Sequence, residues 1–240
     1  MCLRLLSFFF IWRETNLLLA LKSNPTLYLP FIFLLICLEP LEIHAAENDW
    51  EFWNVYSVRW NVTEKWRATL GTEFKFDDDM SNHYYSHADA GVDGRLVKWF
   101  SLGINYRYID ENSSSGWRTE HRPYVTGTFL WNWGNVLWAN RNMLEYRDRE
   151  GRSNTWRYRN RTQAILPQQW TNFKIQPFLS AEILYQFVNS SWNQYRLRAG
   201  LDSRLAEKLQ MNLYYMLRGS ESDDDWDYVN ILGLNFRLAF

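Results

Sequence analysis

His87 and Asp89 are the residues of this sequence best placed for acid–base chemistry. They stand two positions apart, so on an extended strand their side chains project from the same face, about 7 Å apart. An imidazole held by a carboxylate is a common general base. His83 shares this parity, about 13 Å away along the strand, whereas Ser86 falls on the opposite face. Because no nucleophile shares the face of the pair, a hydrolase is only the alternative hypothesis.

Arginine rows are the second feature with chemical potential. Alternate positions of one segment carry arginine, so their guanidinium groups share one face. The planar guanidinium pairs with carboxylates through two parallel hydrogen bonds and stays charged. The same parity rule predicts an inward-facing set that comprises Arg107, Glu120, Arg122, Arg141, Glu145, Arg157, Arg159, Arg161, Glu182, Arg196 and Arg198.

Two interpretations of this set remain open at the level of the sequence. In a packed interior, arginine–carboxylate pairs fill a small barrel and hold its wall together. In an open interior, the excess of arginine lines a narrow pore that favours anions. No segment is long enough to be an obvious plug, which favours some water inside.

The elements that must position these residues are strands, because the chain from Trp50 onward alternates apolar and polar residues. In Phe100–Tyr108 every second residue is aromatic or aliphatic, and the others are Ser, Gly, Asn and Arg. About eleven such segments follow one another. The pattern predicts an all-β fold, an antiparallel transmembrane β-barrel of about ten to twelve strands. Bacterial single-chain barrels have even strand numbers, so ten or twelve strands are expected rather than eleven, and twelve is favoured over ten.

Connections and tryptophan positions indicate a membrane environment. Expected short turns such as Val97–Lys98 and Pro167–Trp170 alternate with longer polar loops such as Asp77–Asn82 and Ser220–Asp225. Tryptophans gather near both sets of connections, which is typical of aromatic girdles at the two membrane interfaces. A soluble lipocalin-like or sandwich fold is the alternative, but it has no reason to place tryptophan at strand ends.

Composition narrows the class further. The 240 residues carry a formal net charge of −1, which gives a nucleic-acid partner no electrostatic basis. The mean hydropathy of −0.42 is too low for a bundle of membrane helices. A barrel tolerates this value, because only every second residue of its strands must be apolar. Cys2 and Cys37 precede the expected barrel, so no disulfide or thiolate metal site is expected within it.

The first 46 residues have the form of an export signal. Lys22 precedes the apolar run Leu27–Cys37, and small residues at Ala45 and Ala46 stand before Glu47. The run is too short to span a bilayer comfortably. We therefore expect a signal region at 1–46, with the true start near residue 21, and a barrel domain at 47–240 in the outer membrane of a Gram-negative bacterium.

The last residues alternate strictly and finish on an aromatic side chain. Leu234, Phe236, Leu238 and Phe240 share one face of the expected final strand. This pattern resembles the C-terminal strand of outer-membrane proteins, which the barrel-assembly machinery reads as its signal.

Six segments of the chain carry a family resemblance, namely the alternating strand around Trp53, Leu70–Phe74, Leu102–Tyr108, Glu120–Arg122, Trp156–Arg161 and Gln194–Gly200. Through these segments, the part of the chain from Trp50 to Phe240 resembles an uncharacterised family of bacterial outer-membrane β-barrels, a domain-of-unknown-function family. The resemblance implies a barrel and an outer-membrane location, and it supplies no catalytic residues.

Together these features predict an outer-membrane β-barrel that is a narrow passive pore or a structural barrel, with an Arg/Glu-lined lumen and an unknown substrate. The alternative is a protease or lipid-modifying hydrolase with His87 and Asp89 at its outer rim. No cofactor or metal is expected, and the acidic loops Asp77–Asp79 and Asp223–Asp225 are expected to be solvated. Expected partners are membrane lipid, lipopolysaccharide and, during biogenesis, the assembly machinery. The oligomeric state is left open.

Overall fold

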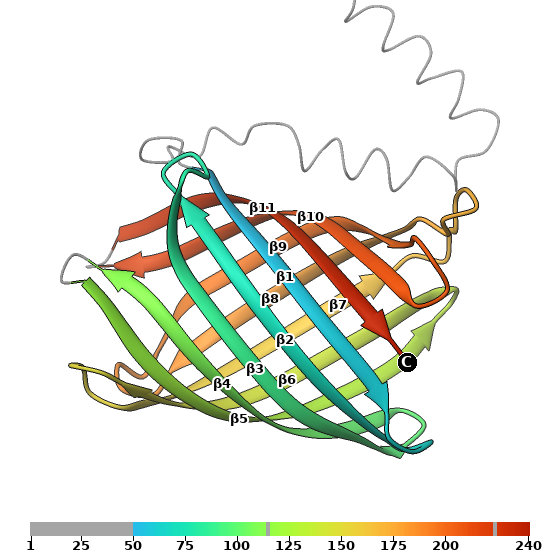
Figure 1. Cartoon of the computed structure of the whole chain (residues 1–240), viewed down its shortest axis with the longest axis horizontal. Helices are drawn as coiled ribbons and strands as arrows, with labels where there is room; N and C mark the ends of the chain where they lie inside the picture. The colour runs from blue at the N-terminus through green and yellow to red at the C-terminus, as the bar shows by residue number, and fades with distance from the viewer. Residues whose placement is uncertain (1–49, 114–115, 223–224) are drawn as a thin grey trace, which may run out of the picture. The chain divides into compact units, whose positions relative to one another are not determined.

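The strands of the computed structural model form a closed β-barrel (Figure 1). The structure describes residues 50–113, 116–222 and 225–240. The predicted signal region at 1–46 lies outside the described residues. The strands are β1 (Trp50–Asn61), β2 (Trp66–Asp77), β3 (Asn82–Val97), β4 (Phe100–Ser113), β5 (Gly116–Trp133), β6 (Val136–Arg149), β7 (Thr155–Ile165), β8 (Gln176–Gln186), β9 (Ser191–Arg204), β10 (Leu209–Ser222) and β11 (Asp225–Ala239).

The barrel closes through a parallel pair of strands. Consecutive strands are antiparallel neighbours, so the first and the eleventh run in the same direction, and they lie side by side in Figure 1. Their ladder runs from Trp50 opposite Asn230 to Arg59 opposite Ala239. The predicted all-β barrel is confirmed. The preference for twelve strands is wrong, because it assumed that the closing pair must be antiparallel like the others.

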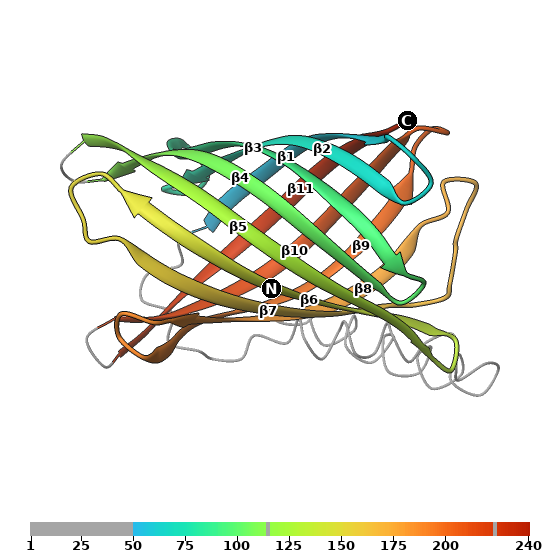
Figure 2. The same ribbon diagram turned by 90° about the horizontal axis from the view of Figure 1, so that it is seen from below.

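The parallel seam places the two ends of the described chain at opposite ends of the barrel. Met80, in the β2–β3 turn, donates its backbone N–H to the Trp50 carbonyl at 3.0 Å. Phe240 donates its N–H to the Arg59 carbonyl at 2.9 Å, next to the β1–β2 turn. These ends are called the Trp50 end and the Phe240 end. The strands run obliquely between them, as barrel closure requires (Figures 1 and 2).

Connection lengths differ from the predicted short–long alternation. The longest connection in the described residues, 166–175, lies at the Phe240 end and contains a bridge between Trp170 and Ile175. At the Trp50 end, strands β4 and β5 extend into a segment that was predicted to be a loop. Residues 110–113 pair there with residues 116–119. Residues 220–222 pair with 225–227 in the same way. Backbone pairing therefore extends beyond the apolar part of these strands.

Over most of its strands, the outward face is apolar in its middle and aromatic near both ends. Ile104, midway along β4, is 70% exposed. Exposed tryptophans near the Phe240 end are Trp60, Trp66, Trp99, Trp131 and Trp133, and those near the Trp50 end are Trp50, Trp117, Trp156, Trp192 and Trp226. Two such bands are the expected pattern of a transmembrane barrel. In the described residues no helix is long and apolar enough to cross a membrane.

A bulge near the start of β3 places His83 on the face of the strand opposite to the predicted one. The register between β2 and β3 shifts beside Tyr84. As the extra residue, Tyr84 turns inward and its hydroxyl donates to Glu51 at 2.8 Å. His83 consequently packs outward, with its ring 5.3 Å from that of Phe76. Strand parity alone had predicted His83 on the same face as His87.

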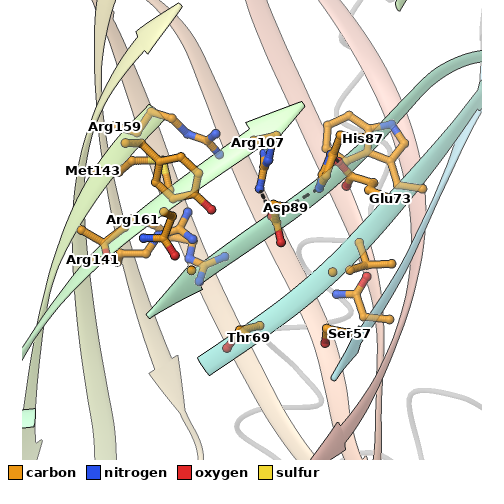
Figure 3. Close-up of a pocket in the computed structure, with 18 of the residues that line it drawn as sticks. Ser57, Thr69, Glu73, His87, Asp89, Arg107, Arg141, Met143, Arg159 and Arg161 are labelled. Carbon is orange, nitrogen blue, oxygen red and sulfur yellow. Dashed lines mark hydrogen bonds and ion pairs between the residues drawn. The ribbon is translucent and has the colours of Figure 1, made fainter. Parts of the chain in front are cut away.

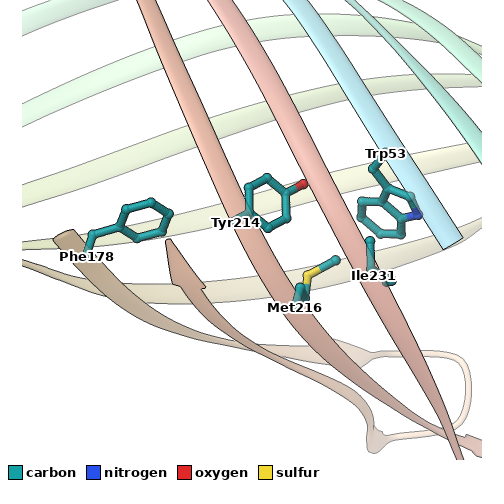
Figure 4. Packing of buried hydrophobic residues seen from close by; sticks show 5 residues of the cluster. All are labelled: Trp53, Phe178, Tyr214, Met216 and Ile231. Atoms are coloured by element: carbon teal, nitrogen blue, oxygen red, sulfur yellow. The ribbon is translucent and has the colours of Figure 1, made fainter. Parts of the chain in front are cut away.

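One sector of the interior is apolar. Trp53, Phe178, Tyr214, Met216 and Ile231 form a buried cluster contributed by β1, β8, β10 and β11 (Figure 4). Full burial of one such side chain stabilises a fold by about 1.5–3 kcal/mol. The cluster therefore supports the wall beside the parallel seam, where ladder hydrogen bonds are slightly weaker than in antiparallel pairs.

We expect Gly233→Ala to destabilise the barrel by about 1–3 kcal/mol, the usual cost of overpacking. A Cβ at this position would lie 1.9 Å from the ring of Tyr214, which is itself buried in the apolar cluster. The measurement is the urea midpoint of the folded, heat-modifiable band on a gel.

The control is Gly127→Ala, whose added carbon would meet the Phe100 ring at 3.3 Å on the outward face. An equal loss of stability in both variants would contradict the role of Tyr214 in this effect.

Candidate functional site

A cavity of about 980 Å³ lies in the interior and is lined by residues from every strand except β8. Glu111 and Arg147 line it near the Trp50 end, and Thr128 and Leu130 line it near the Phe240 end. The cavity therefore extends along the barrel axis. Thirteen arginines and Lys75 line it, against six acidic side chains.

Behind this lining, three glutamates are almost fully buried: Glu120, Glu145 and Glu182 are 5%, 0% and 1% exposed. A buried carboxylate is costly unless opposite charges and hydrogen-bond donors replace its water. Glu120 accepts a hydrogen bond from Arg122 at 2.7 Å, and Arg147 donates to both of its oxygens at 2.9 and 2.8 Å. The second contact is bidentate, the strong geometry for a guanidinium and a carboxylate.

Further ion pairs carry this network across the neighbouring strands. Arg122 lies 3.9 Å from Glu145, and Arg159 lies 3.7 Å from the same carboxylate. Arg159 also donates to both oxygens of Glu182 at 3.0 Å. An unbroken series of charge contacts therefore joins β5, β6, β7 and β8, in the order Glu120, Arg122, Glu145, Arg159, Glu182.

Glu182 is the most crowded point of the network. Arg141 and Arg159 lie 3.0 Å from its carboxylate, Arg196 lies at 3.4 Å and Arg198 at 3.9 Å. One carboxylate neutralises only one of these four guanidinium charges. The wall formed by β6 to β9 therefore keeps an excess of positive charge.

The structure places the predicted inward set in two layers. Its three glutamates are the buried carboxylates, and its arginines line the cavity in front of them, namely Arg107, Arg122, Arg141, Arg157, Arg159, Arg161, Arg196 and Arg198. Arg161 has no carboxylate within ion-pair distance in the described part of the chain. It lies in register between Arg141 and Glu182. Its charge is therefore available to the cavity.

The hydrolase candidates lie on the opposite wall, inside the cavity rather than at the outer rim. His87 has Nδ1 3.2 Å from Glu73 and Nε2 3.4 Å from Asp89. Arg107 donates to Asp89 at 2.7 Å, and Figure 3 shows Arg107 and His87 approaching this carboxylate from two sides. The Tyr85 hydroxyl is a further neighbour of Nδ1, at 3.2 Å. Within the described residues no hydrogen bond joins the His87 ring to a serine or threonine hydroxyl, and Asp89 is also paired with Arg107.

Sequence reasoning missed the aromatic part of this wall. The Lys75 ammonium lies 3.8 Å from the ring centre of Trp53 and 4.0 Å from that of Tyr85, a double cation–π contact. Glu51 accepts hydrogen bonds from the Trp53 indole at 2.7 Å and from Arg218 at 2.8 Å. The available signal was parity, because Glu51 and Trp53 share one face of β1. A tryptophan is assigned more readily to a membrane-facing row.

The residues predicted to form an assembly signal lie along β11 and at the last residue. Phe236 stacks on Tyr56 of β1 with ring centres 5.9 Å apart, and Leu234 lies opposite Asn54. Phe240 is 51% exposed at the barrel end. Their signalling role stays a prediction. In residues 50–113, 116–222 and 225–240 no group of three or more side chains could hold a metal ion.

Residues 50–229 match the protein family of unknown function named DUF2490. The chain belongs to this family. The match confirms the resemblance to an uncharacterised barrel family that the alternating strings carry. Among solved structures, the β domain of the Bordetella autotransporter Brka is similar to this DUF2490 chain with a TM-score of 0.41 and 12% identity, over 70% of this chain and 81% of that one. The comparison with curated proteins finds no match.

We expect Glu182→Gln to destabilise the barrel by about 3 kcal/mol, because removing one partner of a buried ion pair leaves the others uncompensated. Four arginines lose their shared counter-charge in this variant. Urea unfolding of the barrel in lipid, followed by tryptophan fluorescence, measures the loss.

Glu150→Gln is the matched control. The Glu150 carboxylate lies in the β6–β7 turn, where it accepts hydrogen bonds from the backbone N–H and the hydroxyl of Thr119 at 3.0 and 3.1 Å. These bonds are exposed to water, so the midpoint should barely move. Equal midpoints for both variants would show that the buried network does not hold the wall.

Proposed function

We propose that this protein is an outer-membrane barrel whose interior forms a narrow, water-filled pore that favours anions. The observation that carries the proposal is the cavity of about 980 Å³ that extends along the barrel axis with arginine as its main charged residue. The structural-barrel interpretation, with a packed lumen, is the competing outcome.

The membrane location is supported by the outward face. Exposed aliphatic side chains occupy its middle, and exposed tryptophans lie near both ends. Exposing this apolar surface to water would be energetically unfavourable, whereas the hydrocarbon region and the two membrane interfaces accommodate it. The C-terminal row of Leu234, Phe236, Leu238 and Phe240 further supports delivery by the barrel-assembly machinery. Membrane lipid and lipopolysaccharide would then surround the aromatic bands.

The width of the cavity suits small solutes. A twelve-residue strand such as β1 rises about 3.3 Å per residue and tilts by about 40°, so it spans about 30 Å of barrel height. Spread over that height, the cavity volume corresponds to a mean cross-section on the order of 30 Å². At about 30 Å³ per water molecule, this is a few water molecules side by side. Inorganic ions and small organic acids fit such a path, and folded or bulky substrates do not.

The charge of the cavity wall determines whether the path favours anions or cations. The fourteen basic side chains that line the cavity outnumber the six acidic ones, and they remain five ahead when the three buried glutamates are added. The excess is concentrated around Glu182, where Arg141 and Arg161 face the wall of His87 and Asp89 across the cavity (Figure 3). Fixed positive charge along a narrow path lowers the barrier for anions and raises it for cations.

The test is single-channel recording of the folded barrel in a planar bilayer under a salt gradient. We expect reproducible conductance steps and a reversal potential that indicates anion preference. In the triple variant Arg141→Gln, Arg161→Gln and Arg198→Gln, the anion-to-cation permeability ratio should fall about threefold, because three fixed charges leave the path. Glu182 keeps Arg159 and Arg196 as partners in this variant, so the wall should still fold.

The matched control removes three positive charges outside the cavity, through Lys65→Gln, Lys98→Gln and Arg152→Gln in exposed turns. Its reversal potential should equal that of the wild type. A folded wild-type barrel without conductance would overturn the pore and favour the structural barrel. An unchanged reversal potential in the cavity variant would overturn the assignment of anion preference to these arginines.

A further inference from the structure

A group of amide side chains lies on the outward face of β6 and β7. Arg141 and Met143 of β6 line the cavity, so Asn140 and Asn142 project from the other face of the strand. Asn160 and Thr162 of β7 face outward by the same alternation, since Arg159 and Arg161 line the cavity. These four residues, with the hydroxyl of Tyr158, are called the amide patch.

The amide patch lies midway between the two aromatic bands. Along β6 it is bounded by Trp138, which stacks on Trp131 near the Phe240 end, and by Tyr146, which contacts Trp156 near the Trp50 end. In a barrel that spans a membrane, this height is the hydrocarbon region. The following argument therefore rests on the membrane location proposed above.

Hydrogen bonds within the amide patch satisfy part of its polar groups. Asn140 donates to Asn160 at 3.1 Å and to Thr162 at 2.9 Å, and Asn142 donates to Asn140 at 2.8 Å. Asn160 donates to the Asn142 oxygen at 2.9 Å, and the Tyr158 hydroxyl donates to the same oxygen at 2.5 Å. Asn160 also donates to the Asn140 oxygen at 3.3 Å and to the Tyr158 hydroxyl at 3.4 Å, so the oxygens of Asn140 and Asn142 each accept two hydrogen bonds. In the described chain one amide hydrogen of Asn142, the hydroxyl hydrogen of Thr162 and one lone pair of the Asn160 oxygen are left over. Acyl chains offer nothing to bond with them, so lipid is a poor neighbour for this surface.

We propose that the amide patch is the contact between two copies of this chain, packed side by side in the membrane. Primary amides donate and accept equally, so a patch built from them is complementary to itself. A two-fold axis through the patch would let each copy supply the donors that the other lacks, the condition for an isologous interface. Two of the four residues that face the patch from the neighbouring strands are small: Gly127 lies opposite Asn142 and Ala181 lies opposite Thr162, whereas the other two, Phe129 and Ile183, are large. Small residues let two walls approach closely, as they do between membrane helices.

The experiment is cysteine cross-linking in outer membranes from cells that express the full chain, with Cys2 and Cys37 replaced by serine. Leu144→Cys places a thiol beside the patch on β6, and Leu213→Cys places one on β10, on a distant part of the wall. The two leucines are a matched pair, 37% and 39% exposed. We expect a short bis-maleimide to give a product of twice the chain mass from Leu144→Cys, about tenfold more than from Leu213→Cys.

A second variant tests the amides themselves. Adding Asn142→Leu and Asn160→Leu to Leu144→Cys should lower the cross-linked product about tenfold, the effect of losing one or two hydrogen bonds in a membrane. Leucine suits a lipid-facing position, so the barrel should keep its heat-dependent gel shift and show that it still folds.

Every other outcome overturns the dimer. A folded barrel that stays monomeric, equal cross-linking at both positions, or a product whose added mass is that of another protein would each do so. Conductance by a monomeric barrel would overturn the dimer proposal and still support the pore proposal. Recovery of the chain outside the outer membrane would remove the location on which both proposals rest.

Discussion

A carboxylate taken out of water is stable only where opposite charges and donors replace its hydration. Glu120, Glu145 and Glu182 are all in this position, and the arginines that neutralise them come from neighbouring strands. A slip of one residue in any of these strands would turn its arginines toward the outside and leave a carboxylate unpaired. The charge network therefore specifies the register of one half of the barrel, as the apolar cluster around Trp53 does beside the seam.

The same network also explains why the interior is divided. Arginine outnumbers carboxylate along β6 to β9, so this wall needs water or mobile anions to remain stable. The sector that contains Phe178 and Met216 is apolar and needs neither. In the proposed pore, the arginine wall borders the hydrated path and the apolar sector supplies a rigid filling.

Strand parity groups the predicted arginines and glutamates on one face of their strands, because a side-chain period of two persists over long segments. Parity could not tell which arginines meet water and which glutamates lie behind them, since that depends on distances between strands far apart in the sequence. It failed at His83, because the bulge at Tyr84 adds a residue that composition does not reveal. The amide patch escaped notice for a related reason. Where both faces of β6 are polar, the alternation that separates inside from outside disappears.

The parallel seam restricts how this chain could be rearranged. In a barrel with an even number of strands the termini meet at one end, and a hairpin-length linker could join them in a circular permutant. In this barrel β1 begins at the Trp50 end and Phe240 lies at the other, a full barrel height away. A linker between them would have to run the height of the barrel, along its outer face or through the cavity. No other strand can become the first one unless an additional strand brings the termini together.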